Sequence, residues 1–165
     1  LGFFQEPALR LPAASQPQPK AIIDLNQASL GMEAASLSPL QMALASACLT
    51  SGGMFPSPRL VVSVNTPQQG WVILPAEGAS RRVFSQEAAS QVVSLLSVDG
   101  KNIWEAVGRA PNGKDQMVSW FIGGTQPGWN GIPLAISMII EEDNTPLVKS
   151  IGEEILSAGM QFENK

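Results

Sequence analysis

Three apolar segments follow one another between residues 102 and 140, and this succession limits the fold more than any other feature of the sequence. The segments are NIWEAVG (102–108), QMVSWFIGG (116–124) and IPLAISMII (132–140). Asn112-Gly113, in the first connection, is a strong signal for a tight hairpin turn. Short connections join antiparallel strands, so we expect a three-stranded antiparallel meander.

A helix with clear start and end signals precedes this meander. Ser38 and Gln41 form a Ser-x-x-Gln capping box, and Gly52-Gly53 end the helix. Nearly every side chain from Leu40 to Leu49 is apolar or small, which predicts burial on most sides. Cys48 lies within this run, and the chain has no histidine to activate it. We therefore expect Cys48 to be an inert buried thiol.

One hairpin and two further helices complete the pattern. LVVSV (60–64) and WVIL (71–74) predict a β-hairpin, and residues 84–100 and 145–160 predict helices. We expect Ser85 to cap the first of these helices and Gly100 to stop it, and Thr145 to cap the second. The element order predicts an α+β fold in which helices cover an antiparallel sheet.

The 165 residues fit one domain with a real core, because 44% are hydrophobic and only 15% are charged. We divide it into an irregular Pro-rich segment (1–30), a helical part (31–53), a hairpin plus helix (54–101), and the three-strand meander plus C-terminal helix (102–165). The chain begins at Leu1, not Met, and shows no signal peptide. We therefore expect it to be part of a longer protein.

Two residue types are absent, and their absence excludes several chemistries. The chain has no histidine and no tyrosine, so it offers no His base, His metal ligand or Tyr acid. A single cysteine excludes a Cys-based zinc site, and we expect neither a metal nor a cofactor. The net charge of −4 is spread along the sequence and does not indicate a nucleic-acid partner.

Five segments, in the right order, resemble the transpeptidase domains of penicillin-binding proteins. They are LGFFQEPALRLP (1–12), SPLQMALASACLTSGGMFPSPRLV (38–61), FSQEAASQVVSLLSVDG (84–100), SWFIGG (119–124) and PLAISMIIEED (133–143). Each match is weak alone, but together they span nearly the whole chain. The resemblance implies the C-terminal portion of a transpeptidase or β-lactamase-like domain.

The family transfers an acyl group to a serine, using three motifs. These are a Ser-x-x-Lys pair, a Ser-x-Asn and a Lys-Thr-Gly strand. No Ser-x-x-Lys occurs in this chain, and the resemblance places that motif before Leu1. Ser63-Val64-Asn65 matches Ser-x-Asn by letter, but it lies at a strand end after the capped helix, so we interpret it as coincidence.

The third motif would fall on the strand at 102–108. Its best match is Ala106-Val107-Gly108-Arg109, which keeps only the glycine. Ala106 stands where the lysine belongs and Val107 where the hydroxyl belongs, and neither side chain can bind a carboxylate. Alternation along a strand places Arg109 on the other face from Gly108. We therefore expect a substrate-groove strand at residues 106–109 and no catalytic residue in this chain.

Three functions remain open at this point. The first is a degenerate transpeptidase-like domain, a structural or regulatory module of peptidoglycan synthesis. The second is the C-terminal fragment of an active serine D,D-transpeptidase, and the third is an envelope binding module with a borrowed fold. The resemblance implies a location on the extracytoplasmic face of a bacterial membrane, anchored by a segment outside this chain.

The same resemblance suggests which partners the chain would have. They are a peptidoglycan stem peptide or a β-lactam, if the groove is retained, and other cell-wall synthesis proteins. The strand at 132–140 would have an open edge, which is a pairing liability. We expect either a second copy of the chain or a preceding piece of the protein to cover that edge.

Overall fold

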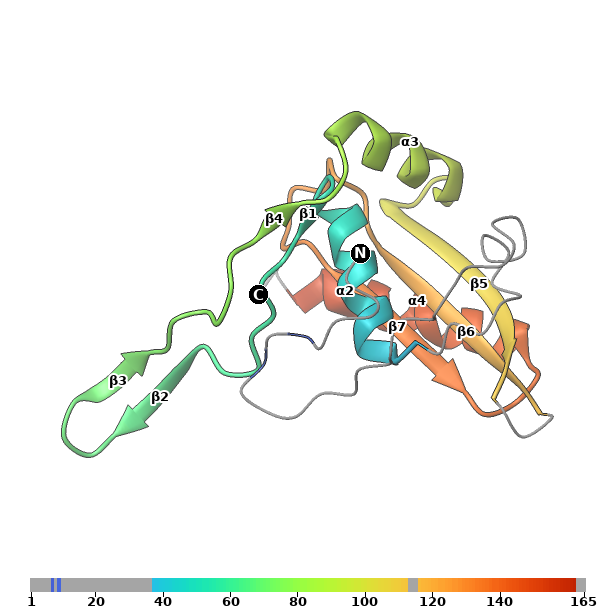
Figure 1. Ribbon diagram of the computed structural model, residues 1–165. Coiled ribbons are helices and arrows are strands. Elements are labelled where there is room, and N and C mark those ends of the chain that lie inside the picture. Colours follow the sequence, from blue (N-terminus) through green and yellow to red (C-terminus); the bar gives the residue numbers. More distant parts are fainter. Residues whose placement is uncertain (1–6, 8, 10–36, 113–115, 163–165) are drawn as a thin grey trace, which may run out of the picture.

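The computed structural model describes residues 7, 9, 37–112 and 116–162 (Figure 1). Its elements are α2 (Pro39–Thr50), β1 (Met54–Phe55), β2 (Ser63–Thr66), β3 (Gly70–Ile73), β4 (Arg81–Arg82), α3 (Gln86–Leu96), β5 (Ile103–Pro111), β6 (Met117–Thr125), β7 (Ala135–Ile140) and α4 (Thr145–Gln161). The Pro-rich segment expected at 1–30 and residue Gly113 of the expected turn lie outside the described residues, apart from positions 7 and 9.

The predicted meander forms an antiparallel sheet in the order β5-β6-β7. Trp120 in the central strand pairs with Gly108 on one side and with Ile139 on the other. Strand β7 begins at Ala135, later than the sequence suggested. Pro133 has no N–H to donate to a ladder, and Leu134 bonds instead to the end of β6, where its N–H donates to Thr125 Oγ1 at 3.1 Å.

Helix α4 covers one face of the sheet and encloses the main core. Ile103, Phe121, Val148 and Leu156 are buried there together. Gly152 is required at this contact, because a Cβ on it would lie 2.4 Å from the Phe121 ring. The helix is capped by Asn144, whose side chain accepts from the Leu147 N–H, so the expectation of Thr145 as cap was wrong by one residue.

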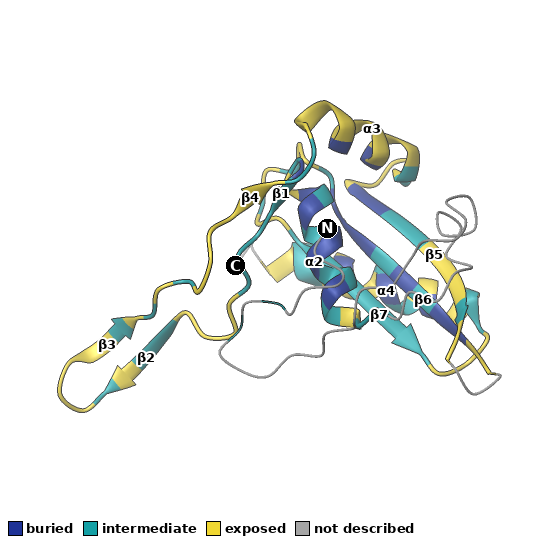
Figure 2. Cartoon of the chain, viewed as in Figure 1, coloured by how far each residue is buried: buried dark blue, intermediate teal, exposed yellow. Residues whose placement is uncertain are grey.

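Helix α2 lies over the opposite face, against β6 and β7, and α3 contacts α2 and β5 (Figure 1). The capping box predicted for α2 is present: Ser38 Oγ accepts from the Gln41 N–H, and Gln41 Oε1 accepts from the Ser38 N–H. Buried residues lie on α2, α3, β5, β6 and α4 (Figure 2). The α+β class and the sheet covered by helices are therefore confirmed.

Two further boundaries, the end of α3 and the start of β2, also differ from the prediction. Helix α3 ends at Leu96, since Ser97 turns to an extended conformation and bridges to Trp104. Gly100, with φ of +72°, lies instead in the turn that leads into β5. The predicted hairpin is present as β2 and β3, but β2 begins at Ser63, and a short β1–β4 pair that the sequence did not indicate joins its base.

Candidate active-site strand

The two faces of β5 point to different helices. Trp104 Nε1 donates to Thr50 Oγ1 of α2 at 3.0 Å, whereas Glu105 forms an ion pair with Lys149 of α4. Side chains alternate along a strand. Ala106 and Gly108 therefore lie on the α2 face, together with Trp104. Val107 and Arg109 lie on the α4 face, together with Glu105.

The α2 face of β5 presents only small apolar groups at the position of the expected motif. Ala106 is half-buried, and Gly108 is exposed, with open space where a Cβ would lie. Ala106 pairs with Ile122 of β6, and Ile122 lines an apolar cavity of about 300 Å³ between α2 and α3. Ala106 and Gly108 thus supply neither a positive charge nor a hydroxyl to a ligand on this face.

Arg109 lies on the other face, as alternation predicts, and is engaged there. Its guanidinium forms an ion pair with Asp143, just before α4, at 3.3 Å. Both side chains are largely exposed, so the pair contributes little to stability. The contact nevertheless directs the arginine charge toward α4, away from the face that carries Ala106 and Gly108.

The outer edge of β5 carries free backbone groups beside these residues. The Val98 N–H donates to the Ile103 carbonyl, so the backbone of Ile103 points away from β6. Alternation then points the N–H and C=O groups of Val107 and Arg109 outward as well. No described strand pairs with this part of β5. An extended peptide could therefore add to β5 at this edge.

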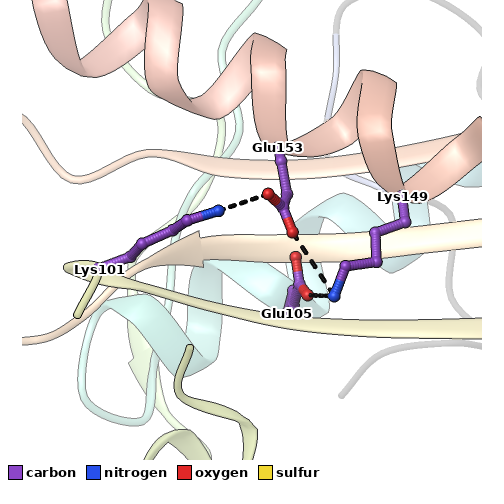
Figure 3. Close-up of polar contacts among 4 residues, drawn as sticks. All are labelled: Lys101, Glu105, Lys149 and Glu153. Atoms are coloured by element: carbon purple, nitrogen blue, oxygen red, sulfur yellow. Dashed lines mark hydrogen bonds and ion pairs between the residues drawn. The ribbon is translucent and has the colours of Figure 1, made fainter. Parts of the chain in front are cut away.

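A charge network holds the α4 face of β5 in place (Figure 3). Glu153 binds both Lys101 and Lys149, and Lys149 also binds Glu105. The hydrogen bond from Lys149 to Glu105 raises the pKa of Lys149, and the bond from Lys101 lowers the pKa of Glu153. The sequence did not reveal this network, because Lys149 is 44 residues from Glu105 and charges at that separation carry no local pattern.

The remaining sequence candidates lie away from β5 or are engaged elsewhere. Cys48 is fully buried, and burial raises the pKa of its thiol, which fits the expected inert role. Ser63 and Asn65 lie in β2, which contacts no described helix or strand except β3. Trp129 is half-buried, and its Nε1 has no hydrogen-bond partner among the described residues.

Neither a metal centre nor a membrane span is found in the part of the chain that the structure describes. Its His, Cys, Asp and Glu side chains form no group of three that could hold an ion. Its helices are all too short or too polar to cross a bilayer.

The chain resembles solved penicillin-binding proteins in structure, although no protein-family model and no curated protein matches its sequence significantly. Penicillin-binding protein A from M. tuberculosis, solved as an imipenem acyl-enzyme complex, is 23% identical over 91% of this chain, with a TM-score of 0.76. A peptidoglycan synthetase from Bifidobacterium adolescentis is 17% identical over 95%, with a TM-score of 0.71. Penicillin-binding protein 3 from M. tuberculosis is 18% identical over 80%, with a TM-score of 0.62.

The matched region is only a part of each of these proteins. It covers 37%, 34% and 36% of the three chains, respectively. Identities this low establish the fold and leave the activity open. The chain therefore has the fold of the C-terminal portion of a penicillin-binding protein transpeptidase domain, as the order of its five segments predicted.

Proposed function

We propose that this chain is a transpeptidase-like module of bacterial cell-wall synthesis that does not itself carry out acyl transfer. One feature carries this proposal: β5 holds Ala106, Val107 and Gly108 at the positions that the resemblance assigns to the Lys-Thr-Gly motif. The nearest cation on the strand, Arg109, is paired with Asp143 on the opposite face. A site without a positive charge loses the charge-assisted bonds that hold a substrate carboxylate.

Strand β5 still offers backbone groups to an extended ligand. The outward N–H and C=O groups of Val107 and Arg109 suit a peptidoglycan stem peptide, or the amide of a β-lactam, bound without covalent reaction. Such binding would be weak, because backbone bonds alone contribute only about 1 kcal/mol each. The module would then position a strand of substrate or scaffold a partner of the cell-wall synthesis machinery.

The outer edge of β7 fits a role within a larger assembly. In the described residues β7 pairs only with β6, so its other edge is free to accept a strand. We assign that edge to another part of the same fold or to a second copy of the chain. We place the module on the extracytoplasmic face of a bacterial membrane, anchored by a segment outside this chain.

A second candidate is the C-terminal part of an active serine D,D-transpeptidase whose nucleophile belongs to a preceding region. It is favoured by the similarity to a protein solved as an acyl-enzyme complex. Both candidates can be tested in the same protein. The two candidates differ in one expectation, which is whether a serine in the preceding region reacts with a β-lactam although Ala106 and Val107 replace the lysine and threonine of the third motif.

The test is covalent labelling by a fluorescent penicillin of a protein that contains this chain together with any region that precedes it. The proposal predicts no labelling of the native protein. The double substitution Ala106→Lys with Val107→Thr rebuilds Lys-Thr-Gly at residues 106–108. The matched control is Gly128→Ala, because a Cβ at this loop position would meet open space. Stoichiometric labelling of the native protein overturns the proposal and supports the active enzyme.

A further inference from the structure

The hairpin of β2 and β3 stands apart from the rest of the described chain. Figure 1 shows it as an arm projecting from the body, and β2 and β3 contact no other described helix or strand. The turn itself is ordered by Thr66, whose hydroxyl accepts from the Gln69 N–H at 3.1 Å. An isolated two-stranded hairpin is only marginally stable in water, whereas three or more strands suffice for stability.

The arm is uncharged, and exposed apolar residues lie at its base and along β3. Every residue between Arg59 and Glu77 lacks a charge. Trp71 and Ile73 are 72% and 74% exposed, and Leu60 and Val62 are exposed as well. Exposed apolar surface of this extent marks an interaction site. The tip, Thr66–Gly70, is polar, and the exposed apolar residues lie behind it. The tip is therefore not suited to insertion into a lipid bilayer.

The outer edge of β3 is built to pair with another strand. The Leu74 N–H donates to the Val62 carbonyl, so alternation points the N–H and C=O groups of Trp71 and Ile73 away from β2. Natural edge strands are usually protected by charges, prolines or bulges, and the segment Gly70–Leu74 has no charge and no proline. Trp, Val and Ile are also the residues that favour strands.

We propose that β3 pairs antiparallel with β3 of a second copy of this chain across a two-fold axis at Val72. Trp71 then pairs with Ile73 of the second copy, an aromatic–β-branched cross-strand pair. The two hairpins form one four-stranded sheet, which meets the number of strands that a stable sheet needs. The proposal does not depend on the proposed function.

Charge favours a second copy over a lipid surface as the occupant. The chain carries a net charge of −4, and none of it lies in the arm. Two uncharged arms can pair without repulsion, and the projection of each arm keeps the two acidic bodies apart. An anionic membrane surface would repel the same bodies. Strand β3 has only four residues, so we expect the paired surface to be smaller than the ~1,200 Å² of stable interfaces and the dimer to be reversible, with a micromolar dissociation constant.

Disulfide trapping tests the register directly. In this register Val72 faces Val72 of the second copy as a non-hydrogen-bonded pair, with Cα atoms about 4.5 Å apart, which a disulfide can bridge. Val72→Cys is expected to form a covalent dimer under mild oxidation, because the native Cys48 is fully buried. Gln68→Cys, exposed at the tip and far from the axis, is the matched control and should stay monomeric. Equal trapping at both positions, or none at Val72→Cys, overturns the register.

Sedimentation velocity tests the dimer itself in the full chain up to about 1 mM, well above a micromolar dissociation constant. Trp71→Glu should raise the dissociation constant at least about tenfold, since it places a charge beside the pairing edge of each copy. Leu95→Glu, at an 86% exposed residue of α3, is the control and should leave the constant unchanged. A monomer at every concentration overturns the proposal, as does a dimer that Trp71→Glu leaves intact. Binding to phosphatidylglycerol vesicles that Trp71→Glu abolishes, without self-association, overturns it in favour of a lipid partner.

Discussion

Trp104 Nε1 donates a hydrogen bond to Thr50 Oγ1 at 3.0 Å, and both side chains are buried. The bond joins the last residue of α2 to β5, two residues before Ala106. Gly124 of β6 packs against the same hydroxyl, because a Cβ there would lie 2.3 Å from Oγ1. This hydrogen bond therefore links β5 to α2 within a largely apolar layer.

Thr50→Val should lower the free energy of unfolding by about 1–3 kcal/mol, because it leaves the buried Trp104 N–H without an acceptor. Thr50→Ser keeps the hydroxyl and removes one methyl group, so it should cost only about 1 kcal/mol. Urea denaturation of both variants measures the difference. Equal losses would contradict the role assigned to the hydrogen bond.

Gly152→Ala should destabilise the fold by about 1–3 kcal/mol, because the new methyl group would meet the Phe121 ring at 2.4 Å. Helix propensity alone predicts the opposite sign, a gain of up to about 1 kcal/mol. Gly159→Ala, in the same helix, is the control, since its methyl would meet only the mobile end of Leu134. Thermal or urea unfolding would contradict the packing argument if Gly152→Ala were the more stable variant.

The charge network between β5 and α4 should make stability depend on pH at both extremes. The pKa of Glu153 is lowered below its ordinary 4.5 by the bond from Lys101, so its contribution is present above pH 4.5 and is lost as the pH falls through the folded-state pKa. The pKa of Lys149 is raised above 10.5 by Glu105, so its contribution is present below pH 10.5 and is lost as the pH rises through the folded-state pKa.

Glu153→Gln tests how the free energy of unfolding depends on pH in the acidic range. Unfolding free energies of the native chain and the variant should differ near neutral pH and converge as the pH falls below the folded-state pKa of Glu153. Glu154→Gln, at the exposed neighbouring residue, is the control. A difference between the native chain and Glu153→Gln that persists unchanged at the lowest pH at which the chain folds would contradict the assignment.

The features that the sequence predicted are those that local signals determine. The Ser38–Gln41 capping box spans four residues, and the alternation that separates Arg109 from Gly108 needs only a correct strand. The end of α3 was not predictable in the same way, because Ser97 leaves the helix to pair with Trp104. Asn144 and Thr145 are both good caps, and sequence alone does not choose between neighbours.

The identity of the candidate site stays a prediction from the resemblance, and its surroundings became visible only in the folded chain. Reading Ala106 and Val107 against Lys-Thr-Gly needed only the resemblance. The pairing of Arg109 with Asp143 was not visible, because the two residues are 34 apart in sequence. The free outer edge beside Val107 depends on where Val98 bonds, and that contact exists only in the folded chain.

The central proposal is that this chain, despite its transpeptidase-domain fold, does not itself form an acyl-enzyme with a β-lactam. Intact-mass spectrometry of the 165-residue chain after incubation with excess benzylpenicillin tests it most directly. We expect an unchanged mass at neutral pH, because no Ser-x-x-Lys is present and Cys48 is buried. A stoichiometric penicilloyl adduct on any residue of the chain would contradict it.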